Sequence, residues 1–261
     1  MRKRALCILL ALCVMHVPAM AQENADGILR EFAGKLFDRI QPEKTPDPYL
    51  WLYEQETTRA VMDDLPGIAQ TLRSLGISDV TEQVENSYRQ MTQEVITLMS
   101  EHGHEYEISR GEMALGLLFA AGSAKKEAPS FVYAFDAEFD DVENMYRDFL
   151  SGIERIGCGE LKFDHIAEDL SGVDGATGDG TRKISFEFRG KTATYQAVAQ
   201  HDWFDAGMLG FMHELMGAGD SGKELYFVFD GMQGVVLFYQ TPQWVKEFTQ
   251  ATGCPLFTSM N

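Results

Sequence analysis

The chain has 261 residues and carries 22 Lys and Arg against 40 Asp and Glu, a formal net charge of −18 at pH 7. An electric field of that sign repels nucleic acid and anionic lipid, so the composition argues against proteins that bind either surface. It favours association with a basic partner, although the simpler interpretation is that it keeps the protein soluble.

The first 21 residues have the three parts of a secretory signal peptide. Arg2, Lys3 and Arg4 are followed by an apolar run over 5–17 and by the small-residue site 19–21. The run is shorter than the roughly 20 residues that cross a bilayer, which disfavours a retained membrane anchor. We therefore expect cleavage before residue 22 and a periplasmic or secreted protein. Cleavage removes three basic residues, leaving 19 against 40 and a charge of −21.

Residues 22–122 are expected to form a helical region, because apolar residues recur there at steps of three and four. Such stripes run through 29–40, 61–75 and 84–98. The segment 113–121 is apolar on every side, which predicts a buried helix. Two pairs of residues have capping-box spacing and are expected to open helices: Asp79 with Glu82, and Ser109 with Glu112.

A polar stretch at 123–130 marks a boundary, after which residues 128–261 are expected to form an α+β domain. Strands are predicted at 131–135, 161–166, 184–188, 192–200, 224–229 and 234–239. Helices are predicted to start at Asp140, Asp202 and Thr241, the last of them ending at Gly253. The expected fold is therefore a helical N-terminal region followed by an antiparallel or mixed sheet of about six strands, with three helices packed on it.

Two cysteines, Cys158 and Cys254, remain after the predicted cleavage. In an oxidising compartment they would be candidates for a disulfide, and two buried thiols are the alternative. Each follows a glycine at a predicted helix C-terminus, where the helix dipole raises the pKa of a thiol. Neither cysteine is therefore expected to be a thiolate nucleophile.

The stretch QHDWFDAGMLGFMHELMG (200–217) collects histidine, acid and tryptophan side chains. Helical phasing places four apolar residues on one face, Phe204, Met208, Phe211 and Leu215. It places His213 opposite that face, where it is expected to be exposed. Asp202 is expected to be the N-cap, with Asp205 in the first turn.

The alternative interpretation of this stretch is a hydrolase site, in which His201 acts as a base beside Asp202 or Asp205. It requires the histidine and an acid to converge on a pocket. As a binding surface, the same stretch offers His201 and the amphipathic Trp203, to which we add Trp244 as a second aromatic near a strand end.

No motif of a known catalytic or cofactor site is present: the serine elbow, the phosphate loop and the helical zinc motif are all missing from the sequence. The pair His102 and His104 lacks a third ligand of matching spacing, so we expect no metal and no cofactor. The sequence therefore favours an exported, non-enzymatic binding or interaction protein of the bacterial cell envelope, which neutralises or holds a basic partner. The alternatives are the hydrolase and a structural subunit of an envelope assembly.

Overall fold

The computed structural model describes residues 64–101, 108–123, 129–217, 221–231 and 233–259. Three sequence predictions lie outside these residues: the signal peptide at 1–21, the helix at 29–40 and the pair His102 and His104.

The described part contains six antiparallel strands in two sheets. The middle sheet has the order β1–β6–β5 and consists of β1 (Tyr133–Asp136), β6 (Gly234–Gln240) and β5 (Glu224–Phe229). The outer sheet has the order β2–β3–β4 and consists of β2 (Phe163–Val173), β3 (Asp179–Phe188) and β4 (Lys191–Gln200). The predicted α+β fold with about six strands is thereby confirmed, although the strands form two sheets of three.

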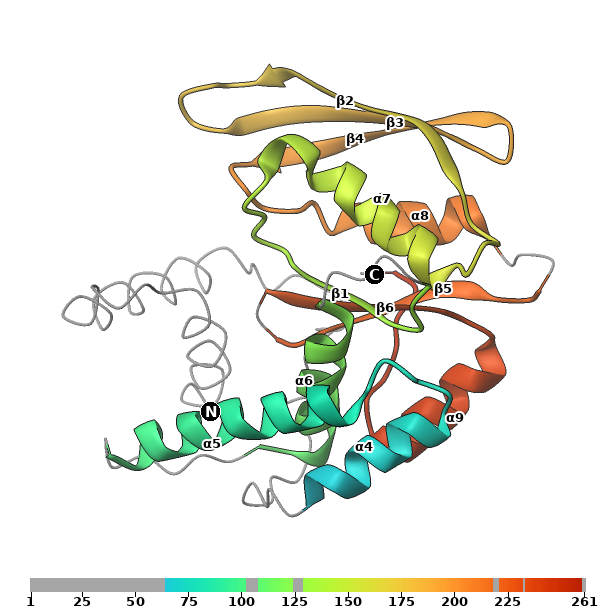
Figure 1. Ribbon diagram of the computed structural model, residues 1–261. Helices are drawn as coiled ribbons and strands as arrows, with labels where there is room; N and C mark the ends of the chain where they lie inside the picture. The colour runs from blue at the N-terminus through green and yellow to red at the C-terminus, as the bar shows by residue number, and fades with distance from the viewer. Residues whose placement is uncertain (1–63, 102–107, 124–128, 218–220, 232, 260–261) are drawn as a thin grey trace, which may run out of the picture.

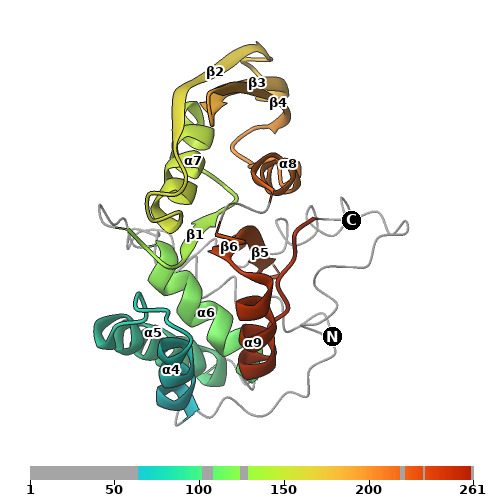
Figure 2. The ribbon, with the colours of Figure 1, turned by 90° about the vertical axis from the view of Figure 1, so that its right-hand side faces the viewer.

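The helices of the described part separate and cover these sheets. They are α4 (Leu65–Ser74), α5 (Glu82–Glu101), α6 (Arg110–Ser123), α7 (Met145–Ile156), α8 (Gly207–Met216) and α9 (Pro242–Thr252), with the 3-10 helix η2 (Val142–Asn144) before α7. Figures 1 and 2 show α7 and α8 between the two sheets, and α4, α5, α6 and α9 on the far side of the middle sheet. The order of layers is therefore sheet, helices, sheet, helices.

Two hydrophobic cores hold these layers together. The first fills the space around α7 and α8 between the sheets, and includes Phe149, Met212 and Phe186. The second lies between the middle sheet and the remaining helices, and joins Leu118 of α6 to Phe238 of β6. Helix α6 is buried as predicted. Its packing on β1 and β6 means that the helical region and the α+β region share a core within the described residues.

The helix starts show which caps are local. Ser109 and Glu112 form the predicted capping box: the Ser109 N–H donates to Glu112 Oε2 at 2.6 Å, and the Glu112 N–H donates to Ser109 Oγ at 3.1 Å. The capping box predicted for Asp79 and Glu82 is wrong. The Asp79 carboxylate is buried and accepts the Ser130 hydroxyl and the Phe131 N–H. Thr81 caps α5 instead, because its hydroxyl accepts the Val84 N–H.

Two helices of the α+β region, α7 and α9, have local caps and start close to the predicted residues. Asp141, one residue after the predicted Asp140, accepts the Asn144 N–H ahead of α7. Thr241 accepts the Trp244 N–H and opens α9 as predicted, and Gly253 ends that helix with a left-handed φ of 77°. A residue with positive φ is most easily a glycine, which explains the stop.

Candidate functional site

Residues 201–206 form a loop, which corrects the prediction that a helix starts at Asp202. His201 turns the chain after β4 with a φ of 55°, and α8 begins only at Gly207, with no side-chain cap. Asp202 is therefore not an N-cap; its backbone carbonyl accepts the Phe139 N–H at 2.8 Å. The buried face of α8 also differs from the predicted one and consists of Met208, Leu209, Met212 and Met216.

The contacts of Asp205 explain why α8 does not begin within this loop. Its Oδ2 accepts the Tyr195 hydroxyl at 3.0 Å and the Val198 N–H of β4 at 2.9 Å, and its Oδ1 accepts the Gly207 N–H at 2.9 Å. Its own N–H donates to the Tyr146 hydroxyl at 3.2 Å. One residue therefore ties β4, α7 and the start of α8 together, a positioning role that uses both carboxylate oxygens.

The structure does not assemble the hydrolase arrangement. His201 is exposed, and its N–H donates to the Gly178 carbonyl at 3.0 Å. Among the described residues, no hydrogen bond or ion pair joins the His201 ring to Asp202 or Asp205. A general base acts within hydrogen-bond reach of its partner, and in this structure the His201 ring makes no such contact with either acid.

A surface cluster of acids is the most distinctive charged feature of the described chain. We call it the acidic loop cluster, and it consists of Asp136, Glu138, Asp140, Asp141, Glu143 and Asp202. Asp136 ends β1, the next four lie in the connection from β1 to α7, and Asp202 comes from the loop after β4. The two segments meet because Trp203 makes antiparallel bridges to both Glu138 and Gln200.

Glu138 shows how strongly these charges interact. Partial burial, and then the nearby carboxylates of Asp202, Asp136 and Asp140, raise the pKa of Glu138 above its ordinary 4.5, although the Gln233 amide donates to Oε2 at 2.7 Å and opposes the rise. Because these three carboxylates repel a negative charge on Glu138, ionising Glu138 costs free energy in the folded protein.

Replacing Glu138 with glutamine is therefore expected to raise the melting temperature slightly at about pH 7, because it removes the repulsion and keeps an acceptor for Gln233. The raised pKa means that the folded protein binds this proton more tightly than the unfolded chain. Wild-type stability should gain as the pH falls through the raised pKa, so the difference between the two proteins should narrow by about pH 4. Thermal unfolding at both pH values measures this. A Glu138→Gln variant that is less stable than wild type at neutral pH would contradict this prediction. The control is Glu94→Gln, which removes one negative charge from an exposed position on α5.

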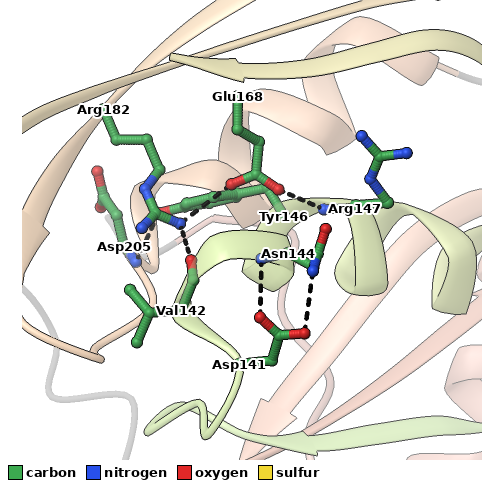
Figure 3. Close-up of polar contacts among 8 residues, drawn as sticks. All are labelled: Asp141, Val142, Asn144, Tyr146, Arg147, Glu168, Arg182 and Asp205. Carbon is green, nitrogen blue, oxygen red and sulfur yellow. Dashed lines mark hydrogen bonds and ion pairs between the residues drawn. The ribbon is translucent and has the colours of Figure 1, made fainter. Parts of the chain in front are cut away.

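Under the outer sheet lies a second polar group, which is buried (Figure 3). Arg182 and Glu168 form an ion pair at 3.0 Å, with side chains only 3 % and 4 % exposed. The same nitrogen, Nη1, donates to the Val142 carbonyl at 2.6 Å, and the Arg147 N–H donates to the other Glu168 oxygen at 3.0 Å. These contacts fix β2 and β3 against the start of α7 and leave the pair closed to a ligand.

His213 was expected to be exposed, but it is half-buried. Its Nδ1 lies 3.0 Å from the Leu225 carbonyl of β5, and because a carbonyl only accepts, Nδ1 carries the proton. Its Nε2 is 4.0 Å from Glu224, which also accepts the Tyr226 hydroxyl at 3.3 Å. Burial and Glu224 raise the pKa of Tyr226 to about 12. The group joins α8 to the edge of the middle sheet.

The remaining sequence candidates have packing roles. Trp244 stacks on Phe248 with ring centroids 5.1 Å apart, and its Nε1 donates to the Leu75 carbonyl at 2.8 Å, so both its ring and its donor are used inside the protein. The candidate disulfide is not formed, because Cys158 and Cys254 are both free and lie in different surroundings. Cys158 is exposed, so the alternative of two buried thiols holds only for Cys254, whose pKa burial raises to about 12.

No group of three or more His, Cys, Asp and Glu side chains suited to a metal ion occurs among the described residues. No helix within the described ranges is long and apolar enough to span a bilayer. Comparison with known proteins found no family model, no curated protein and no solved structure that matches the chain.

The acidic loop cluster was missed as a site by sequence reasoning, which took Asp140 only as the start of a helix. A local signal was present, since five of the eight residues in 136–143 are acidic. The contribution of Asp202 had no such signal, because it depends on the pairing of Trp203 with Glu138.

Proposed function

We propose that this protein is an exported, non-enzymatic binding protein of the cell envelope that holds a basic partner through the acidic loop cluster. The observation that carries this proposal is the concentration of carboxylates around Glu138, where Asp202, Asp136 and Asp140 add to the effect of burial in raising the pKa of Glu138. Repulsion between carboxylates gathered at one place on a surface lowers stability. A partner of opposite charge that binds there would neutralise these carboxylates, which explains why the protein keeps them.

Trp203 supports the proposal because it brings an aromatic ring to the same place. It is half-buried and pairs through its backbone with Glu138. A lysine or arginine side chain is attracted both to the face of an indole ring and to carboxylates, so the two together suit a basic side chain. His201, exposed in the same loop, would lie at the rim of such an interface.

The loop that carries Asp202 and Trp203 is held firmly at its other end. Phe204 is buried among aromatic rings, with its centroid 4.7 Å from that of Phe149 and 5.0 Å from that of Phe135. Asp205 adds the hydrogen bonds to β4 and α8. A surface fixed in this way loses little conformational entropy on binding, which favours affinity.

The test is capture of a basic protein at two salt concentrations. Purified protein, secreted with its own signal sequence and immobilised, is exposed to envelope extract in about 0.05 M and about 0.5 M salt. We expect retained proteins to be basic and to be released at the higher concentration, because salt screens contacts between charges. The retained partner is then purified and its affinity measured by calorimetry.

The variant Glu138→Gln, Asp140→Asn, Asp202→Asn should bind that partner about tenfold more weakly at low salt. The matched control, Glu94→Gln, Glu214→Gln, Glu247→Gln, removes the same charge from other exposed positions and should stay within about twofold of wild type. Equal loss in both variants would assign binding to net charge alone. Salt-indifferent capture, or capture of acidic partners only, would overturn the proposal.

A further inference from the structure

Strand β4 is a weakly protected sheet edge in the described chain. On the opposite edge of the same sheet, β2 has two register shifts, and Arg147 donates to its Ile166 carbonyl at 3.3 Å. In the middle sheet, Phe257 pairs with Phe227 and closes the outer edge of β5. Bulges, arginine contacts and covering segments are the usual ways in which a protein blocks strand addition. None of these covers the first part of β4.

The geometry of β4 favours pairing with another strand. It follows β3 through ten consecutive pairs without a register shift, and residues 192–200 contain no charge, glycine or proline. The Val198 N–H points away from β3, since it donates to Asp205. By the two-residue period, the N–H and C=O groups of Thr192, Thr194 and Gln196 point the same way. All three side chains are exposed, and Val198 is 57 % exposed.

We propose that β4 pairs antiparallel with β4 of a second copy of this chain, which joins two outer sheets into one of six strands. Asp205 blocks the edge at Val198, so the free part is centred on Thr194. A two-fold axis there places Thr194 opposite Thr194 of the second copy, and Thr192 opposite Gln196. A two-fold interface of this kind is closed and uses the same surface on both copies.

Charge supports the second copy as the occupant. In this register Lys191 of one copy lies opposite Ala197 of the other copy, and its side chain is on the face of the sheet that is turned toward the helices. There it lies next to Asp205 of the other copy, the residue whose carboxylate accepts the Val198 N–H. The axis therefore creates two identical contacts between a basic and an acidic side chain. Apart from Lys191 the strand carries no charge, and the repulsion between the remaining charges of the two copies is screened over about 8 Å at physiological salt. Figure 2 shows the outer sheet at one end of the molecule, with α8 beneath β4.

Sedimentation velocity over a range of protein concentrations tests the dimer. The wild type should dimerise reversibly. Thr194→Pro removes an N–H that faces solvent in the monomer, a position where an edge strand tolerates proline. It should weaken the dimer about tenfold or more, because each copy loses a donor at the axis. Thr194→Val keeps that donor and should dimerise like wild type. A protein that stays monomeric, or a Thr194→Pro dimer of unchanged affinity, overturns the proposal.

Two further variants keep the proposal testable if Thr194→Pro does not fold. Lys191→Glu should weaken the dimer about fivefold, whereas Lys246→Glu on α9 should not. In a Cys158→Ser background, Thr194→Cys should cross-link the dimer under mild oxidation, because directly opposed residues lie about 5.5 Å apart. Thr192→Cys should not, because the axis separates the two copies of that residue by about 13 Å. Cross-linking at 192 but not at 194 overturns the register and with it the proposal.

Discussion

Replacing Glu168 with alanine is expected to lower the free energy of unfolding by about 3–5 kcal/mol, because it leaves the guanidinium of Arg182 buried and unpaired. Both side chains are almost fully buried, and the pair they form is 3.0 Å long. Arg182 would keep only the Val142 carbonyl as a hydrogen-bond acceptor. Urea unfolding followed by circular dichroism measures the loss.

The double variant Arg182→Met, Glu168→Leu separates two free energies: the loss of stability when one charge is left unpaired, and the net contribution of the intact ion pair to stability. Apolar side chains of similar volume remove both charges, so stability should return to within about 2 kcal/mol of wild type or exceed it. A loss below about 1 kcal/mol in Glu168→Ala would show that water reaches the guanidinium in solution, in contradiction of the buried pair in Figure 3.

The same pair sets a dependence of stability on pH. Burial raises the pKa of the Glu168 carboxyl above its ordinary 4.5, against the opposing contacts from Arg147 and Arg182. A carboxyl with a raised pKa in the folded state contributes stability below its unfolded pKa and loses that contribution as the pH rises through the folded value. Stability of the folded protein is therefore expected to fall as the pH rises through the raised pKa of Glu168, which thermal unfolding over a range of pH measures.

What the sequence predicted well is local in the chain. The period-two alternation of Ile184, Phe186 and Phe188 predicted β3, and the box of Ser109 and Glu112 predicted the start of α6. In each case the residues that decide the structure lie within a few positions of one another. Thr241 and Gly253 bounded α9 for the same reason.

The failures involve partners that are distant in the sequence. Asp79 has the spacing of a cap, yet it binds Ser130 and Phe131, 51 and 52 residues away. Asp205 was predicted to lie in the first turn of a helix, yet its N–H donates to the Tyr146 hydroxyl, 59 residues away. A polar side chain that finds a buried partner across the fold gains more than a local cap provides, and sequence spacing carries no record of that choice.

The division into two sheets has the same origin. Tyr133 of β1 pairs with Leu237 of β6, and the whole outer sheet is inserted between these strands in the chain. Alternation identifies a strand but not its neighbour, so six strands with similar patterns were compatible with one sheet. The candidate site inherits this limit, because the acids of 136–143 form a local run whereas Asp202 reaches them only through the fold.

Replacing Phe204 with alanine is expected to lower the free energy of unfolding by about 3–5 kcal/mol, because it opens a cavity in the first core. Phe204 is 6 % exposed, and its ring lies against those of Phe135, Phe149 and Tyr146, with centroids 4.7–5.2 Å apart. Thermal and urea unfolding measure the loss, and binding of the basic partner should fall with the folded fraction.

Trp203→Ala is the matched control, since it truncates the neighbouring aromatic residue. Trp203 is only partly buried, so the variant should lose less stability than Phe204→Ala while binding the basic partner clearly more weakly. The two adjacent residues would then have separate roles, Phe204 anchoring the loop and Trp203 contacting the partner. Unchanged binding in a folded Trp203→Ala protein would remove the indole from the interface and leave the carboxylates to account for recognition alone.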